Sequence, residues 1–243
     1  SETDYIATDL ASDKKATNRI LGDLGLPVPR QIAVTDADEA KKAARRIGFP
    51  VVVKPLDGNN GNGISINLKT EEAVAESFDF ALEYNKRGDT VIVETFIQGF
   101  DHRMLVIDGK LEAVSKRVPG HIVGDGKHTA AELIEIVNSD PRRGVGHEKV
   151  LTRLELDKTA KDHLAEAGYS ENDVPKDGEV VFLRSTANLS TGGTAIDVTD
   201  IVHPDNRNMA ERAIKAIGLD IGGVDFLSAD ISQSYKDNNA GIC

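Results

Sequence analysis

A lysine and three glycines stand close together early in the chain, in a pattern suited to binding phosphate. Residues 51–68 read VVVKPLDGNNGNGISINL, so Lys54 closes a β-branched run just before Gly58, Gly61 and Gly63. Glycines lack a Cβ and let backbone N–H groups approach phosphate oxygens, while a lysine adds a positive point charge. Glycine and asparagine clusters also mark ordinary surface turns. This segment alone leaves both interpretations open.

The segment does not match the two common phosphate motifs that lead into a helix. A Walker loop needs Gly-Lys-Ser/Thr, whereas Gly63 is followed by Ile64 and Ser65; a dinucleotide fingerprint needs a third glycine at position 66, which is isoleucine. Residues 64–68 alternate with a period of two, which is typical of a strand. The sequence therefore predicts a β-hairpin of residues 51–54 and 64–68 with its tip at residues 58–63.

A second chemical candidate is a carboxylate inside an apolar strand near the end of the chain. Asp225 lies in the sequence Gly-Gly-Val-Asp-Phe-Leu. A buried carboxylate is costly unless it is paired or bound to a metal ion. We therefore expect Asp225 to be buried and compensated by a cation.

Helices and strands alternate around these candidates. Ser12 or Asp13 can cap a helix that ends at Gly25, a capping box of Thr35 and Asp38 starts a second helix that stops at Gly48, and Thr70 opens a third. The third helix is expected to run to about residue 86. Further helices are expected near 130–137, 158–167 and 205–217, and strands at 91–97, 103–107, 110–118, 180–184 and 221–229.

Two of these strands have partners that the sequence indicates. The Asp108-Gly109 pair predicts a hairpin between residues 103–107 and 110–118. The strand at 221–229 has its expected partner at Gly241, three residues from the end, so we expect the C-terminal lobe to be truncated there.

Composition excludes several classes of protein. The chain has 243 residues, 40% hydrophobic residues and a formal charge of −11, which disfavours a nucleic-acid surface. It has no apolar run of the roughly 20 residues needed to span a bilayer, so no membrane partner is expected. Cys243 is the sole cysteine; without an internal disulfide, a cytoplasmic protein is expected.

An ordered set of segments resembles the ATP-grasp superfamily. The set consists of SDKKATNRIL, VVVKP with its glycine hairpin, VIVETFIQGFDHRMLVI and GGVDFLSADI. Three other segments, RVPGHIVGDGKHTAAELI, DPRRGVGHEKVLTRLELD and TANLSTGGTAIDVTD, are similar to the ATP-grasp portion of the cyanophycin synthetase family. The resemblance implies an α+β fold of two lobes that grip ATP between antiparallel sheets, with a glycine-rich hairpin as a flap. The lobes would be residues 13–99 and 100–243, after a lead-in of residues 1–12 and with an insertion at about 119–179.

The resemblance also implies which residues bind nucleotide. Lys14 and Lys54 would neutralise phosphates, and the hairpin glycines Gly58, Gly61 and Gly63 would cover them. Glu94 and the backbone of Phe96 and Ile97 would face adenine, and Asp101 would bind the ribose. From the residues alone, Glu94 and Asp101 fit solvated strand-end carboxylates equally well. Asp225 matches a magnesium ligand whose companion Glu-x-Asn motif would follow Cys243, so the chain as given is expected to be inactive.

The remaining implied roles concern the transferred phosphoryl group and the acceptor. Arg117 and Arg184 would be catalytic and face the γ-phosphate, which suits an arginine fork. Arg103 and the loop residues Asn188, Ser190, Thr191 and Gly192 would bind substrate, although the sequence Ser-Thr-Gly-Gly also fits a plain turn. An anionic partner would need local cations despite the acidic whole. These include Arg117 and a basic segment with Arg142, Arg143, Lys149 and Arg153.

The implied reaction is an ATP- and Mg²⁺-dependent ligation of a carboxylate to an amine. The expected substrates are aspartate and an acidic peptide or polymer, with aspartate added to the C-terminus of a polyaspartate backbone. A homo-oligomer within a larger multidomain chain is expected. The alternatives are a peptide ligase of the glutathione synthetase type and a non-catalytic ATP-binding module, which the absent Glu-x-Asn motif favours.

Overall fold

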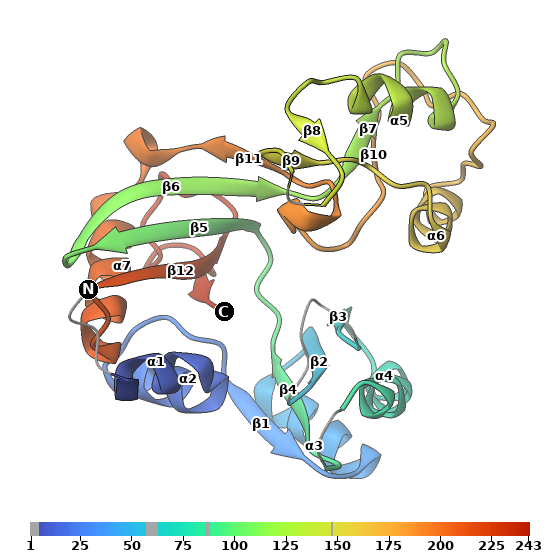
Figure 1. Cartoon of the computed structure of the whole chain (residues 1–243). Helices are drawn as coiled ribbons and strands as arrows, with labels where there is room; N and C mark the ends of the chain where they lie inside the picture. The colour runs from blue at the N-terminus through green and yellow to red at the C-terminus, as the bar shows by residue number, and fades with distance from the viewer. Residues whose placement is uncertain (1–4, 57–62, 86–87, 147) are drawn as a thin grey trace. The chain divides into compact units, whose positions relative to one another are not determined.

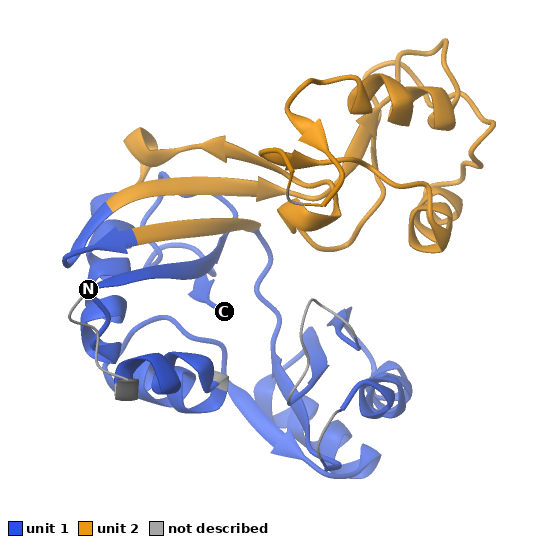
Figure 2. Cartoon of the chain, in the orientation of Figure 1, with its two compact units in different colours: residues 1–99, 106–111, 203–243 blue, residues 100–105, 112–202 orange. Residues whose placement is uncertain are grey.

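The computed structural model describes residues 5–56, 63–85, 88–146 and 148–243, without the side chains of Tyr5, Ile6 and Lys14. Figure 1 shows a mixed α+β chain whose larger sheets are antiparallel. The expected α+β class is confirmed. Two compact units divide the chain: unit 1 holds residues 1–99, 106–111 and 203–243, and unit 2 holds residues 100–105 and 112–202 (Figure 2). None of the described helices is long and apolar enough to cross a bilayer.

Unit 1 contains a four-stranded antiparallel sheet with one face buried. Its order is β1 (Gln31–Val34), β4 (Val91–Thr95), β2 (Val51–Pro55) and β3 (Ser65–Leu68). The inward side chains of β2 and β4 pack with the helices α3 (Ala37–Ile47) and α4 (Glu71–Glu83) in one hydrophobic core. Strand side chains alternate between faces. The opposite face, here called the polar face, carries Gln31, Lys54 and Glu94 beside the buried apolar Val52 and Ile92.

The predicted hairpin is confirmed at its two strands. Val51 pairs with Leu68 and Val53 with Ser65, in antiparallel register. Most of the expected tip lies outside the described residues, but Gly63 is buried with φ of 70°. A Cβ at Gly63 would lie 2.8 Å from Tyr84 Cβ. Both the backbone conformation and the space therefore require glycine where the tip meets β3.

Local capping signals explain most helix starts. Asp13 caps α2 (Lys14–Asp23) and Thr70 caps α4, as predicted. The second predicted helix is capped differently: the Asp36 side chain accepts from the backbone N–H of Glu39, and the Glu39 carboxylate accepts from Thr35 N. The prediction of a Thr35 and Asp38 capping box was therefore wrong. A helix α1 (Tyr5–Ser12) precedes Asp13, in the segment expected only as a lead-in.

The rest of unit 1 is built on β12 (Ile221–Ser228). Helix α7 (Pro204–Ile217) packs against it, and β13 (Gly241–Ile242) pairs with it through Phe226 and Leu227. The segment after β4 reaches the same place: a Cβ at Gly99 would lie 2.5 Å from the Ser228 carbonyl carbon, and one at Gly241 would lie 2.5 Å from Ile97 Cδ1. Two glycines thus permit the close packing of residues 97–99 on β12 and β13.

Unit 2 has its own core around the middle of the chain. The short sheet of β7 (His121–Val123) and β10 (Val180–Phe182) packs against α5 (Ala130–Asn138) and α6 (Lys158–Glu166). Both helices were predicted, whereas β10 ends two residues before the predicted Arg184. There the chain leaves the strand, and Leu183 N donates to Gly120 O.

The remaining elements of unit 2 lie around the segment that precedes α6. A parallel pair, β8 (Arg143–Gly144) and β9 (Leu151–Thr152), adjoins the 3-10 turn η1 (Leu189–Thr191). A second such turn, η2 (Thr199–Ile201), follows the strand β11 (Thr194–Asp197).

A five-stranded sheet has the order β11, β6, β5, β12, β13, with its strands divided between the units. Its remaining strands are β5 (Phe100–Ile107), β6 (Lys110–Val118) and β11 (Thr194–Asp197). Asp108 and Gly109, which connect β5 to β6, have φ of 48° and 74°. Positive φ at both positions is the requirement of a type I′ turn, which closes the hairpin that the Asp-Gly pair predicted.

Candidate active site

The polar face of the four-stranded sheet carries the candidate cation Lys54. Its Nζ lies 2.7 Å from Glu94 Oε1, and Gln31 Nε2 donates to Glu94 Oε2 at 2.8 Å. The strand register brings these residues together, because Gln31 lies opposite Glu94 on β1 and β4, and Glu94 lies opposite Val52 on β2. Lys54 is two residues further along β2, on the same face.

The pair is sheltered from solvent. The side chain of Lys54 is 21% exposed and that of Glu94 is 10% exposed. Glu94 is therefore not a solvated strand-end carboxylate, which was the alternative that the sequence left open. Low exposure strengthens the attraction between the two charges relative to a surface pair, and it also raises the cost of leaving either one alone.

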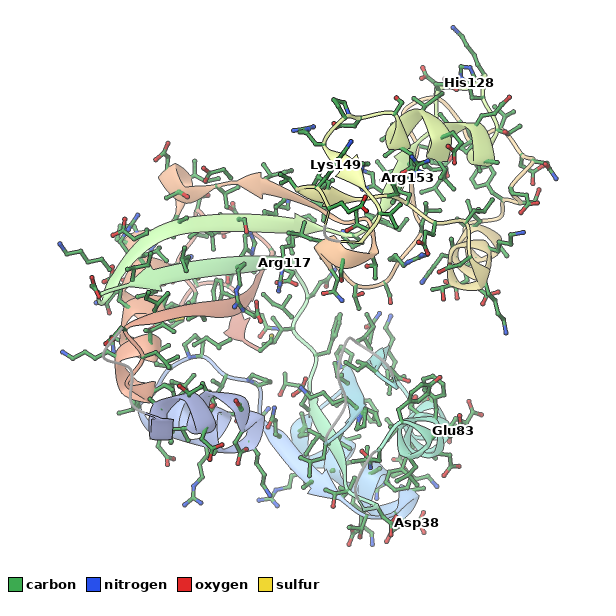
Figure 3. All side chains as sticks on the ribbon, viewed as in Figure 1. Asp38, Glu83, Arg117, His128, Lys149 and Arg153 are labelled. Atoms are coloured by element: carbon green, nitrogen blue, oxygen red, sulfur yellow. The ribbon has the colours of Figure 1, made fainter. Side chains whose placement is uncertain are left out.

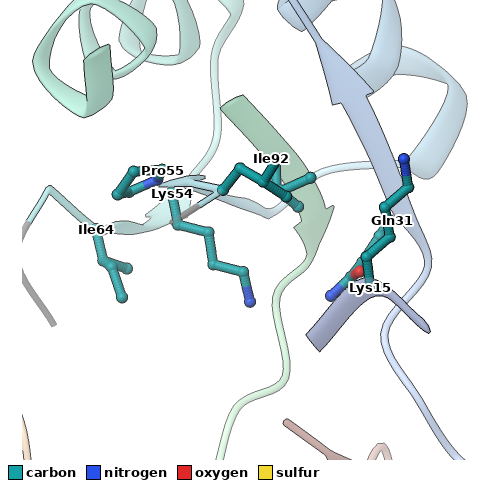
Figure 4. Close-up of a pocket in the computed structure, with 7 residues that line it drawn as sticks. Lys15, Gln31, Lys54, Pro55, Ile64 and Ile92 are labelled. Carbon is teal, nitrogen blue, oxygen red and sulfur yellow. The ribbon is translucent and has the colours of Figure 1, made fainter. Parts of the chain in front are cut away.

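A small pocket lies beside this pair. Figure 4 shows Lys54 on one side and Lys15 with Gln31 on the other; Pro55, Leu56, Ile64 and Ile92 complete the lining. Its volume of about 30 Å³ suits water. A nucleotide would enter only if the lining side chains moved apart. The pocket thus combines two ammonium groups with apolar walls.

Two lining residues were missed by the sequence analysis. Lys15 lines the pocket, while Lys14 was the lysine predicted for phosphate and its side chain lies outside the description. The paired lysines of SDKKAT indicated a cation for phosphate, but the sequence did not show which of the two lines the pocket. Gln31 was missed because β1 was not predicted; the alternation in QIAV could have indicated it. Gly58 and Gly61 lie outside the described residues.

In unit 2, a second candidate cation is also paired with a predicted nucleotide ligand. Arg117 on β6 (Figure 3) donates from Nη2 to Asp101 Oδ1 at 2.7 Å. Asp101 and Arg103 lie on the same face of β5, since His102 and Met104 between and beyond them are buried. Arg103 is exposed. The structure thus brings Asp101 into direct contact with Arg117 and places it on the same face of β5 as Arg103.

Arg184 has a different environment. Its Nη2 lies 2.9 Å from Asp157 Oδ2, its Nη1 donates to the carbonyl oxygen of Leu183, and its side chain is 10% exposed. These contacts tie it to the segment that leads into α6. A catalytic role for Arg184 would require it to leave Asp157 or to share its charge with a phosphate.

The predicted substrate loop forms a compact turn at η1. Asn188 O accepts hydrogen bonds from Thr191 N, Thr191 Oγ1 and Gly193 N. Ser190 is exposed, whereas Gly192 and Gly193 are buried. The loop therefore presents the Ser190 hydroxyl to solvent, while the hydrogen bonds to Asn188 O hold the backbone on the buried side.

Asp225 is only half buried, contrary to the expectation of a buried carboxylate. Val224 and Phe226 are 5% and 0% exposed because they point into the core, and the alternation of β12 sends Asp225 to the other face. Phe96 is also half buried and Ile97 is 8% exposed, and both follow the end of β4. Within the described ranges, no group of three His, Cys, Asp or Glu side chains gathers as a ready metal site.

The basic segment of unit 2 is not a uniform cationic surface. Arg142 is held by Asp140 at 2.7 Å and Arg153 by Glu135 at 3.1 Å. Arg143 is 7% exposed, so the expectation that it contacts an acidic polymer is wrong. Lys149 and Arg153 lie beside β8 and β9 (Figure 3).

Comparisons with known proteins agree on the class that this fold defines. Solved ATP-grasp ligases share the fold: PsnB, in a complex with minimal precursor, Mg and ADP, is 15% identical over 98% of this chain and 50% of its own, with a TM-score of 0.52. A bifunctional glutathione synthetase from Pasteurella multocida is 31% identical over 100% of this chain and 34% of its own, with a TM-score of 0.73. The chain is an ATP-grasp domain.

The family follows from the sequence match. Residues 13–152 match the family described as carbamoyl-phosphate synthase L chain, ATP binding domain, and the chain belongs to it. The cyanophycin synthetase of a Nostoc species is 47% identical over 97% of this chain and 26% of its own length. A glutathione biosynthesis bifunctional protein of Clostridium perfringens is 35% identical over 100% of this chain and 31% of its own length. The chain thus spans about a quarter to a third of these curated relatives.

Proposed function

We propose that this domain catalyses ATP-dependent ligation of a carboxylate to an amine, and that it adds L-aspartate to the C-terminus of a polyaspartate backbone. One observation carries the choice of substrates. Identity to the Nostoc cyanophycin synthetase is 47% over nearly the whole chain, against 35% to the glutathione biosynthesis protein. The ATP-grasp fold supports the first step of the reaction, which both kinds of ligase would share.

ATP is the proposed phosphoryl donor, and the sheltered Lys54, the exposed Lys15, and Arg117 are suited to its phosphates. Lys54 and Lys15 line the pocket on the polar face of the four-stranded sheet, and a lysine neutralises a phosphate as a point charge. Arg117 offers a planar fork that suits the charge on a transferred phosphoryl group. Glu94 holds Lys54 in place and Asp101 holds Arg117. A bound nucleotide would compete with these carboxylates for the two cations or share the cations with them.

The proposed chemistry needs no nucleophile from the protein. A carboxylate oxygen of the acceptor attacks the γ-phosphorus, the bond to ADP breaks, and an acyl phosphate forms. The amine nitrogen of aspartate then attacks the acyl carbon, phosphate leaves with its oxygen, and the amine loses a proton. The domain contributes positioning and stabilisation of charge.

Mg²⁺ fits this chain in part. Mg²⁺ is commonly bound by one or two carboxylates together with substrate phosphates, and Asp225 supplies one half-buried carboxylate on β12. When bound there, Mg²⁺ would neutralise charge on the phosphate oxygens. We assign the metal contact of this chain to Asp225, and the ATP contacts to the lysine pocket and the segment that follows β4.

The loop at η1 is the proposed acceptor site. Its exposed Ser190 offers a hydroxyl and the neighbouring Asn188 an amide group to a carboxylate, and Arg103 offers a cation on β5. These groups suit an anionic acceptor, which the acidic chain as a whole would repel.

A matched substrate assay tests this function. ADP release is measured on the full-length protein, since residues 1–243 alone are expected to be inactive, with a polyaspartate acceptor plus aspartate and with γ-glutamylcysteine plus glycine, at equal concentrations. We expect the first pair to support faster release, and omission of aspartate to abolish amide formation. Equal or faster release with γ-glutamylcysteine and glycine would favour the glutathione-type alternative, and nucleotide binding without release from either pair would favour a non-catalytic module.

A further inference from the structure

Arg143 is a buried cation for which the described part of the chain provides no ion pair. The residue is 7% exposed, and its Nη1 donates to two backbone carbonyls, Thr152 O at 2.6 Å and Gly192 O at 3.1 Å. Burial lowers the pKa of its guanidinium. Burying a charge costs free energy, so a buried arginine is expected where its hydrogen bonds fix the position of neighbouring groups.

The two carbonyls belong to segments far apart in the sequence. Thr152 is on β9, the parallel partner of the strand that carries Arg143, and Gly192 ends the turn η1. One guanidinium nitrogen thus links β8, β9 and the turn. A lysine side chain ends one bond earlier, at the position of the arginine Cζ, so its ammonium would not lie at the place of Nη1 between the two carbonyls.

The turn is closely fitted to its surroundings. Gly192 has φ of 90°, and a Cβ there would lie 2.6 Å from Leu154 Cδ2. A Cβ at Gly193 would lie 2.7 Å from Asn188 O and 2.9 Å from Val118 O. The inner side of the turn is therefore fixed by sterics and by Arg143, while Ser190 stays exposed on the outer side.

We propose that Arg143 is a positioning residue, which holds the carbonyl of Gly192 so that the turn presents Ser190 to the acceptor. The assignment of the acceptor rests on the proposed function; the bridge from Arg143 to the turn does not. Arg143 itself contacts neither nucleotide nor acceptor in this arrangement. It acts on the substrate loop from behind.

Hydrogen exchange of the turn tests the bridge independently of any activity. In Arg143→Met, amides of residues 190–193 should exchange at least about tenfold faster, the equivalent of one lost charge-assisted hydrogen bond. Exchange in the four-stranded sheet of unit 1 should be unchanged. Arg142→Met is the matched control, because it removes an adjacent arginine that is exposed and bound to Asp140.

Two further variants keep the test decisive. Arg143→Lys retains the charge and should still loosen the turn, and it replaces Arg143→Met if that variant does not fold. Gly192→Ala disturbs the same turn through its positive φ and the contact with Leu154, and should give the same local exchange. Unchanged exchange at residues 190–193 in both Arg143 variants, or an equal increase in Arg142→Met, would overturn the proposal.

Kinetics then separate positioning from general destabilisation. In Arg143→Lys, the KM for the polyaspartate acceptor should rise about tenfold while the Kd for ATP stays unchanged, because the lysine pocket is untouched. An equal loss for ATP and acceptor would contradict a positioning role. If the unsubstituted protein releases no ADP with either substrate pair, the proposed function fails, and the exchange result alone decides whether Arg143 holds the turn.

Discussion

Two ion pairs in the molecule, Lys54–Glu94 in the four-stranded sheet and Arg142–Asp140 before β8, are formed in opposite ways. The first joins residues 40 positions apart and depends on the register of β2 and β4, with side chains 21% and 10% exposed. The second joins residues two positions apart within one turn, with side chains 70% and 28% exposed. The second pair is exposed to solvent, which weakens the attraction between its two charges.

The difference shows which charges the fold has organised. The sheet places Lys54 on its polar face beside a pocket, with a second lysine opposite. The turn places Arg142 in solvent, where its partner is close along the chain. A sheltered cation at a pocket is a candidate for ligand binding, while a locally paired surface cation is a candidate for a modest effect on stability.

Replacing Lys54 should give the largest effect. Lys54→Met removes the ammonium at the pocket and should weaken ATP binding by about 1.5–3 kcal/mol, the value of a charge-assisted contact. Glu94 keeps its hydrogen bond from Gln31 but loses its cation, so the variant should be less stable, and circular dichroism must show that it is folded before its affinity is measured. Isothermal titration calorimetry with ATP measures the change.

Lys69→Met is the control for the loss of a positive charge on the same sheet, because Lys69 directly follows β3 and is exposed. It should leave ATP affinity within the experimental error. Unchanged affinity in Lys54→Met, or an equal loss in Lys69→Met, would remove Lys54 from the nucleotide site and leave it a structural partner of Glu94.

Replacing Asp140 should give a small effect that depends on pH. Hydrogen bonds from the Arg142 side chain and backbone lower the pKa of Asp140 from 3.8 to about 2. A carboxylate with a depressed folded-state pKa stabilises the protein above its unfolded-state pKa, and this contribution is lost as pH falls from about 4 towards 2. Asp140→Asn should therefore lower the urea midpoint slightly at pH 6, and the difference should shrink as pH falls through 3.

The same titration in Arg142→Met shows whether the pair is responsible. Both variants should show the same pH trend, since either one removes the pair. A difference between Asp140→Asn and the unsubstituted protein that stays constant from pH 6 to pH 3 would mean that the ionisation of Asp140 does not contribute to stability.

Features set by neighbouring residues could be predicted from the sequence. The caps at Asp13 and Thr70, and the hairpin at Asp108-Gly109, depend on a few adjacent side chains and were identified correctly. The hairpin of β2 and β3 was found from the β-branched run before the glycines and the alternation after them. The ordered motifs also led to the ATP-grasp fold, which the structure and its solved relatives confirm.

Features set by distant contacts could not be predicted. Arg142 and Arg143 are adjacent and identical in type, yet one is in solvent and the other is buried, because the acceptors of Arg143 lie 9 and 49 residues away. Gln31 reaches Glu94 across 63 residues. Asp225 was expected to be buried from its apolar neighbours, and only the face it occupies on β12 shows otherwise.

The central claim is that the domain activates an acceptor carboxylate by phosphorylation, and an isotope transfer experiment tests it most directly. The acceptor is a short polyaspartate with ¹⁸O at both oxygens of its C-terminal carboxylate, used in large excess over aspartate so that each acceptor is extended at most once; it is incubated with the protein, ATP, Mg²⁺ and aspartate, and the released phosphate is analysed by mass spectrometry. The account predicts one ¹⁸O in each phosphate formed, because the carboxylate oxygen leaves with the phosphoryl group. Phosphate that is formed together with the amide but carries no ¹⁸O would contradict it.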